Sequence, residues 1–264
     1  MERGKRKATF AMAVALGTWL LATACSSGDE KTSIPSATGS VAAEPTAQAA
    51  ASLEDAARKD NILLGTIPGR DVSVYGREAG GVIVQAGDKR HTYDDWLYMT
   101  PRGIEPSMRL RDFDGDGREE LAIAFTVGSG TGVSVDELRL VDPVTFDDRL
   151  FSPDEYLSQL REATDLKIVT VDGELTGDIA IEGKHRAISL KKYQSDDYGP
   201  IDDGFLFGSI VRFIVEDGGI KAQFGAGMHV VAFVTPEYIG TIDADVRYEA
   251  GRFTLTNLRF AEIE

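Results

Sequence analysis

From about residue 66 to its end, the chain consists of short β-branched and aromatic runs separated by Gly and Asp. Examples are "RDVSVYGRE", "GGVIVQAGDKRHTYDDW" and "LAIAFTV" (121–127). Runs bounded by such turn residues are typical of strands. In the last run large and small side chains alternate with a period of two, which predicts one buried face and small residues on the other. The sequence therefore predicts antiparallel sheets.

Two segments depart from this pattern and predict short helices. "SPDEYLSQLREATD" (152–165) offers Ser152 as N-cap, Pro153 at the first helical position and acids in the first turn. "SLEDAARKDNILL" (52–64) has apolar residues at helical spacing. Turn residues at 217–219 and 249–251 predict hairpins. The predicted fold class is mainly β, an α+β arrangement leaning to all-β with one or two short helices.

The N-terminus has the pattern of a secretory signal peptide. "MERGKRK" is basic, Ala8–Ala24 is apolar, and small residues precede Cys25, the only cysteine of the chain. Ala22-Thr23-Ala24 suits an ordinary signal peptidase. The same stretch resembles a bacterial lipobox, which implies a lipid on the sulfur of Cys25. Both alternatives predict export, and the lipobox favours an anchor in the cell membrane on its extracytoplasmic side.

The remaining chain divides by composition. Residues 25–51 are small and polar and bear Pro, which predicts a disordered tether between the signal peptide (1–24) and a β-rich domain (52–264). The net charge of −15 repels nucleic acid and anionic headgroups, so a nucleic-acid partner is not expected. The single cysteine excludes an intramolecular disulfide.

"RDFDGDGREELAIAF" (111–125) carries the clearest chemistry. Carboxylates alternate at Asp112, Asp114 and Asp116, and Glu120 lies at position 9 of a loop numbered from Asp112. Calcium prefers six to eight oxygen ligands, and Arg118 at position 7 offers its carbonyl oxygen. The alternative is an empty polar turn, since Asp-Gly is also ordinary turn chemistry. An EF-hand needs Glu at position 12, where this chain has Ile123.

The loop and its flanks (106–142) resemble the strand–loop–strand calcium repeat of the VCBS/FG-GAP type. The resemblance implies that Asp112, Asp114, Asp116, Glu120 and the main chain of Arg118 bind a structural calcium ion at 112–120. Glu120 departs from the family, which usually has Asp there. The whole layout also looks like exported lipoproteins of Gram-positive bacteria, which implies a location and no activity.

Other segments carry weaker chemistry. "GSGTG" (128–132) lacks Gly-Lys-Ser/Thr, so a strand connection near the calcium loop is favoured over a phosphate site. No two of the three histidines are spaced as a local zinc pair. "SDDYGPIDDG" (195–204) is either a solvated acidic loop or a second site, and the aromatic residues around it pack in the core or form a ligand surface.

These observations predict an exported, membrane-anchored calcium-binding lipoprotein with a β-rich domain. The metal is expected to be structural, no catalytic residue is assigned, and the domain is expected to be a binding or envelope-associated module. The alternative is a cell-envelope hydrolase that uses carboxylates near a cation.

Overall fold

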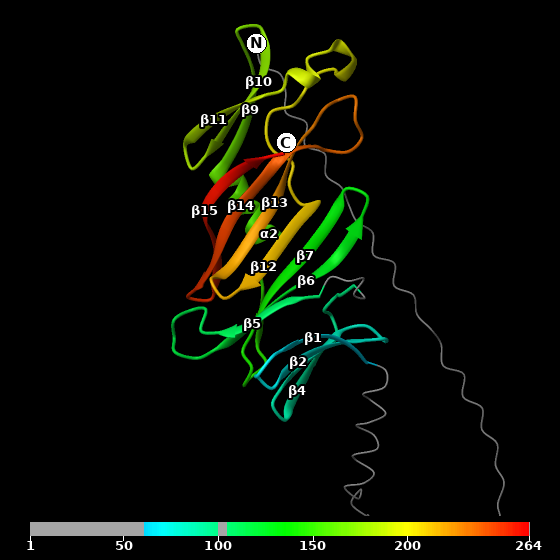
Figure 1. Ribbon diagram of the computed structural model, residues 1–264, viewed down its shortest axis with the longest axis vertical. Coiled ribbons are helices and arrows are strands. Elements are labelled where there is room, and N and C mark those ends of the chain that lie inside the picture. The colour runs from blue at the N-terminus through cyan, green and yellow to red at the C-terminus, as the bar shows by residue number, and fades with distance from the viewer. Residues whose placement is uncertain (1–60, 100–104, 264) are drawn as a thin grey trace, which may run out of the picture. The chain divides into compact units, whose positions relative to one another are not determined.

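The computed structural model describes residues 61–99 and 105–263, and they form a mainly β structure (Figure 1). The predicted mainly β fold class is therefore confirmed. The predicted signal peptide (1–24), Cys25 and the tether (25–51) lie outside the described residues, as do residues 52–60 of the first predicted helix. Among the described residues, no helix has the length and apolar character needed to cross a membrane.

The first part of the described chain is a four-stranded antiparallel meander. Its strands are β1 (Asn61–Ile67), β2 (Val72–Arg77), β3 (Val82–Ala86) and β4 (Lys89–Tyr93). The predicted helix over 52–64 is wrong at 61–64, because Asn61 already begins β1 and pairs with Arg77. Leu63 is exposed and Leu64 is buried, so these two leucines follow strand periodicity.

The largest sheet has eight strands in the order β15-β14-β13-β12-β7-β6-β5, with β8 also paired to β7. Their bounds are β5 (Ser107–Arg111), β6 (Glu120–Gly130), β7 (Val133–Val141), β8 (Asp148–Leu150), β12 (Ile210–Glu216), β13 (Gly219–Met228), β14 (Glu237–Glu249) and β15 (Arg252–Glu262). The predicted hairpins at 217–219 and 249–251 join β12 to β13 and β14 to β15. Among the strands that the structure describes, antiparallel pairing has one exception, because β12 runs parallel to β7 over two residues.

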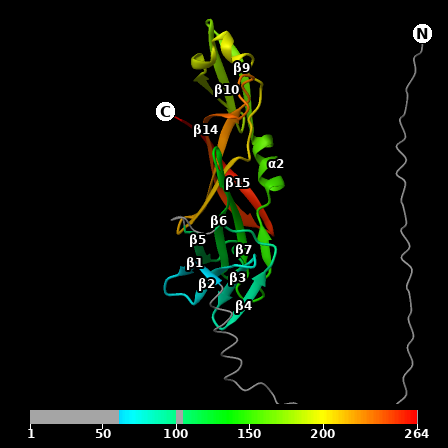
Figure 2. The same cartoon turned by 90° about the vertical axis from the view of Figure 1, so that its right-hand side faces the viewer.

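The chain between β8 and β12 forms a helix and a three-stranded sheet. Its elements are α2 (Pro153–Ala163), β9 (Thr164–Val171), β10 (Glu174–Ile181), β11 (Lys184–Ser189) and two 3₁₀ turns, η1 (Lys191–Tyr193) and η2 (Asp196–Tyr198). The predicted helix cap is confirmed, because the Ser152 side chain and Glu155 form a capping box. Figure 2 shows α2 beside β15, where the Gln159 amide binds the backbone of Phe253 and Leu255.

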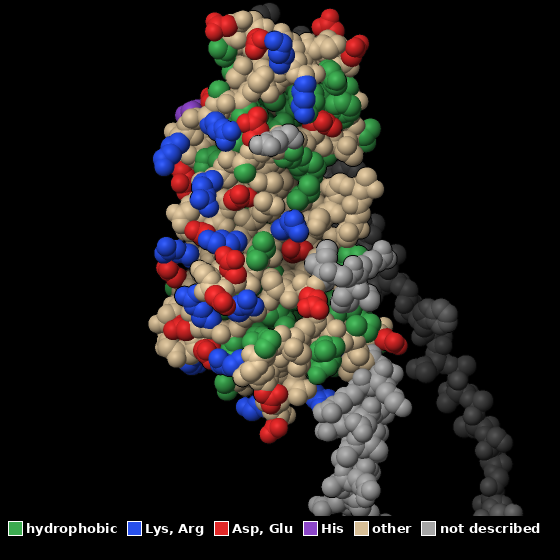
Figure 3. All heavy atoms as spheres, in the orientation of Figure 1, with side chains coloured by type: hydrophobic (Ala, Val, Ile, Leu, Met, Phe, Trp, Pro, Cys, Tyr) green, Lys and Arg blue, Asp and Glu red, His purple; other side chains and the backbone are tan. Residues whose placement is uncertain are grey.

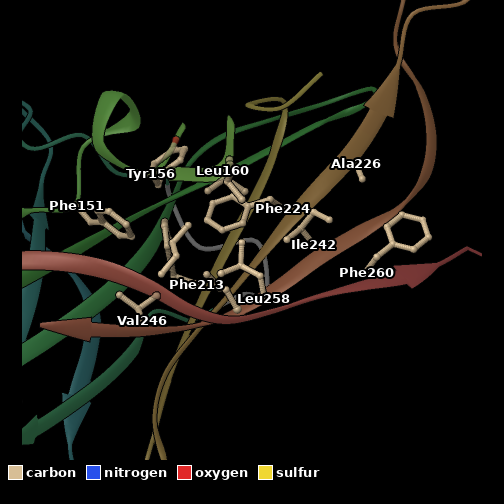
Figure 4. Close-up of a cluster of buried hydrophobic side chains, with 14 of the residues drawn as sticks. Phe151, Tyr156, Leu160, Phe213, Phe224, Ala226, Ile242, Val246, Leu258 and Phe260 are labelled. Carbon is tan, nitrogen blue, oxygen red and sulfur yellow. The ribbon is translucent and has the colours of Figure 1, made fainter. Parts of the chain in front are cut away.

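Two buried clusters share strand β6. One cluster contains Ala122 and Ala124 with aromatic residues of α2, β12, β13 and β15, including Tyr156 and Phe224 (Figure 4). The other contains Leu121, Ile123 and Phe125 with the interior of the four-stranded sheet. The prediction that β6 has only one buried face is therefore wrong: its small residues let a second packed layer approach closely.

A charge network around the buried Arg139 borders the second cluster at Trp96. Arg139 is only 7% exposed, and its guanidinium lies over Trp96, with Cζ 4.5 Å from the ring centroid. It donates to Asp148 Oδ2 at 2.7 Å and to Glu137 Oε2 at 3.0 and 3.1 Å. Both carboxylates compensate the buried cation, and the bond to Asp148, the first residue of β8, joins that short strand to β7.

Candidate metal centre

The aspartate loop joins two adjacent antiparallel strands, as the sequence predicts. Arg111, the last residue of β5, pairs with Glu120, the first residue of β6. Gly115 and Gly117 have φ values of 80° and 89°, and nothing lies within 4 Å of the position of an added Cβ at either glycine. The left-handed backbone, rather than lack of space, therefore explains glycine at both positions.

Three of the predicted ligands lie together. Asp112, Asp114 and Asp116 each offer one carboxylate oxygen, and these oxygens all lie within 4.8 Å of one another. Calcium–oxygen distances of about 2.3–2.6 Å place two ligands of one ion at most roughly 4.6–5.2 Å apart. The observed spread therefore fits a shared calcium ion.

Backbone amides inside the loop orient these carboxylates. Asp112 accepts from Gly115 N at 2.6 Å and from Gly117 N at 3.0 Å. Asp114 accepts from Asp116 N at 3.1 Å. These hydrogen bonds hold the carboxylates in place, but they also satisfy an empty polar turn. The hydrogen bonds alone therefore fit both alternatives, and the three converging carboxylates could hold a cation.

Arg118 is an exposed residue whose side chain faces the cluster. Its Nε and Nη2 donate to Asp116 Oδ2 at 3.0 and 2.8 Å, and Nη1 lies 3.9 Å from Asp142. The side-chain hydrogen bond from Arg118 holds the pKa of Asp116 below its usual value. A metal ion at this loop would therefore compete with this guanidinium for one oxygen of Asp116.

Glu120 lies outside the group of three oxygens. Its Oε2 accepts a hydrogen bond of 2.8 Å from the backbone N–H of Phe113. Burial raises the pKa of Glu120, and the charges of Asp114, Asp112 and Asp116 raise it further against the opposing Phe113 bond. The structure thus brings together three of the four predicted carboxylates.

The acidic segment 195–204 shows no comparable convergence. Asp202 Oδ2 lies 2.7 Å from His229 Nδ1, and Asp203 accepts from the backbone N–H of Ile168 at 2.8 Å. Within the described ranges, the aspartates of the 112–116 loop are the only group of three or more possible metal ligands. Tyr198, Phe205 and Phe207 pack against the first hydrophobic cluster, as expected for core aromatics.

"GSGTG" forms the end of β6 and the turn into β7, so the predicted strand connection is confirmed. Its predicted nearness to the calcium loop is wrong, because the loop precedes the first residue of β6 and this turn follows the last.

A second feature is not predicted from the sequence. A cavity between β5, β6, β7 and β12 is lined by Asp136 and Arg212, among other residues. Asp136 stands inside "VDELRLVD", which reads simply as a strand, and Arg212 is 76 residues further along the chain. No local spacing relates the two, so only the fold brings them together.

Comparison with known proteins yields no match: no family model, no curated protein and no solved structure is similar to this chain. The fold and the loop chemistry therefore carry the functional argument.

Proposed function

We propose that this protein is an exported, calcium-binding β-domain lipoprotein whose metal ion is structural and whose domain acts as a binding or envelope-associated module. The observation that carries the proposal is the convergence of Asp112, Asp114 and Asp116 on a hairpin loop. Three neighbouring carboxylates repel one another, Arg118 pairs with only one of them, and a divalent cation would offset the remaining repulsion.

The donor set favours calcium. The cluster offers carboxylate oxygens without sulfur or imidazole, and such ligands suit hard cations. Calcium also accepts irregular geometry and completes its shell with carbonyls and water. Asp112, Asp114 and Asp116 would hold the ion, and Glu120 or the main chain of Arg118 would join after a local rearrangement.

The position of the loop supports a structural role for the ion. It connects β5 to β6, and β6 packs into both hydrophobic clusters. An ion that fixes the first turn before β6 therefore stabilises the strand on which both clusters depend. The ion would also compensate the negative charges of the loop carboxylates, and neither effect requires a bound substrate.

The location is proposed from the N-terminal sequence. A lipid on Cys25 would attach the chain to the membrane, and no nucleic acid is expected as partner. In support, basic and acidic side chains are interspersed on the face seen in Figure 3 rather than gathered by sign. Replacing Cys25 by Ser should release the protein from the membrane fraction of the expressing bacterium. Continued membrane attachment of the variant would contradict the lipid anchor.

Thermal unfolding with and without calcium tests the metal site. Free calcium at about ten times the dissociation constant stabilises by about 1.4 kcal/mol. For a domain of this size that corresponds to roughly 3–6 °C in Tm. EDTA should reverse the shift, and Asp114→Asn should abolish it.

Asp88→Asn is the matched control, because Asp88 is an exposed aspartate in the β3–β4 turn outside the loop. It should keep the full calcium response. A wild-type Tm that is the same in calcium and in EDTA would contradict the proposal. An equal loss of the calcium-dependent Tm shift in Asp114→Asn and Asp88→Asn would contradict it as well.

A second candidate function, a cell-envelope hydrolase, has one observation in its favour. Glu105 and Asp136 line the same cavity, and paired carboxylates can serve as acid and base. This candidate predicts turnover of a chromogenic glycoside that is lost in both Glu105→Gln and Asp136→Asn. Absence of turnover across a panel of such glycosides would remove it.

A further inference from the structure

The cavity between β5, β6, β7 and β12 arises from the sheet topology. β12 pairs with β7 only through Ile210 and Val211, after which β7 pairs with β8 instead. The diverging strands leave a space of about 220 Å³. At roughly 30 Å³ per water molecule this holds about seven waters, the size of a small metabolite.

Asp136 is fixed at the wall of this cavity. Its Oδ1 accepts from the Thr126 hydroxyl at 2.8 Å, and its Oδ2 accepts from the backbone N–H of Phe213 at 3.2 Å. Thr126 is also its partner across the β6–β7 ladder. The carboxylate is therefore oriented by two neutral donors, and within the described chain it forms no ion pair.

Arg212 lines the same cavity and is likewise unpaired. Its guanidinium forms neither a salt bridge nor a side-chain hydrogen bond with any residue that the structure describes. It is adjacent in sequence to Phe213, whose N–H holds Asp136. Burial raises the pKa of Asp136, and the hydrogen bonds from Thr126 and Phe213 and then the charge of Arg212 offset only part of that rise. One cavity thus presents a cation and an anion that do not neutralise each other by contact.

The rest of the wall is largely apolar. Leu64, Phe125 and Ile214 contribute hydrophobic side chains, and Glu105 adds a second negative charge. A few placed polar groups in an apolar wall are typical of small-molecule sites. A ligand that fits must carry both charges and a small apolar body.

We propose that this cavity binds a free amino acid with a small apolar side chain, its ammonium group on Asp136 and its carboxylate on Arg212. The site is independent of the calcium loop and uses none of its residues. It goes beyond the proposed calcium function by giving the domain a ligand class.

Isothermal titration calorimetry of the full-length protein tests this proposal with L-alanine, L-valine and L-leucine. Concentrations reach about 10 mM, where a ligand with a Kd of about 1 mM is mostly bound. Isoamylamine and isocaproate, which are leucine without its carboxylate and without its amine, are the matched probes. Leucine, or a smaller member of the series, should bind roughly tenfold or more tightly than either probe, since each lacks one charged contact.

Two variants locate the binding. Arg212→Gln should weaken amino-acid binding roughly tenfold or more, and Arg252→Gln, at an exposed arginine outside the cavity, should leave it unchanged. Asp136→Asn should weaken it as well. Because Asp136 also accepts the hydrogen bond from the Phe213 N–H, Asp136→Asn could fold poorly. In that case the binding data for Arg212→Gln alone test the proposal.

Three results would overturn the proposal. They are no heat with any of the three amino acids, unchanged affinity in Arg212→Gln, and isoamylamine or isocaproate binding as tightly as the best of the three amino acids. Titration in EDTA separates this site from the calcium loop, because amino-acid binding should persist there even if the calcium proposal fails.

Discussion

Replacing Arg139 by Met should destabilise the domain well beyond the loss of an ordinary surface ion pair. The substitution keeps an unbranched stem, which is shorter than that of Arg, and removes the cation between Glu137 and Asp148. It leaves two carboxylates beside each other in a largely buried place, and an uncompensated buried charge is costly.

The magnitude follows from the exposure of the three side chains. Breaking a fully buried ion pair costs about 3–5 kcal/mol. The Arg139 side chain is 8% exposed, but those of Glu137 and Asp148 are 21% and 28% exposed, so water partly resolvates them. We therefore expect a loss of about 2–3 kcal/mol, which includes the lost contact with Trp96. For a domain of this size this lowers Tm by roughly 5–10 °C.

Urea denaturation followed by circular dichroism measures the loss, and the midpoint should fall while the slope m stays constant. Arg149→Met is the matched control, because Arg149 is 44% exposed and ion-pairs with Glu155 at the surface. Its loss should stay below about 1 kcal/mol.

A double variant tests the reasoning directly. If the uncompensated carboxylate causes the penalty, Arg139→Met with Asp148→Asn should be less destabilised than the sum of the two single changes. An additive result, or an Arg139→Met loss no larger than that of Arg149→Met, would refute the account.

Two further predictions concern the large sheet. Lys221 donates to Asp245 at 2.5 Å and, with Asn257, lowers the pKa of Asp245, so its folded pKa lies below the unfolded value of about 3.9. The stabilisation from the ionised Asp245 is present above about pH 4 and is lost as pH falls through the folded pKa. The difference in unfolding free energy between wild type and Asp245→Asn, measured by urea titration, should therefore shrink from about pH 5 to 3. A difference that does not change with pH would contradict this prediction. Gly240→Ala places a Cβ 2.4 Å from the Ala261 carbonyl oxygen and 2.5 Å from the Phe260 ring, so calorimetry should show a loss of about 1–3 kcal/mol. Gly218→Ala, whose Cβ meets only a side-chain oxygen at 3.7 Å, should not show this loss.

Local sequence signals predicted the features that depend on neighbouring residues. Ser152 and Glu155 cap α2, and Asp217-Gly218 closes the β12–β13 hairpin, because each rests on contacts within a few residues. The aspartate loop was predictable for the same reason. Its glycines and alternating carboxylates encode the turn locally.

Features that depend on distant residues were not predictable. Alternation in 121–127 reports side-chain size, but only the fold shows that a second cluster packs on Ala122 and Ala124. The parallel pairing of β12 with β7 joins residues about 75 positions apart, and the cavity containing Asp136 and Arg212 exists because of that pairing. Likewise, the regular spacing of 112–120 predicts Glu120 as a ligand and does not reveal its bond to Phe113 N–H.

The position of β6 between two clusters has a consequence for hydrogen exchange. Neither cluster can unfold locally without exposing β6, which also packs in the other cluster. The most protected backbone amides of both clusters should therefore exchange through one shared unfolding event. A calcium ion bound just before Glu120 would then slow exchange in both clusters by the same factor. The protection pattern would extend far from the loop, although the ion touches only one hairpin.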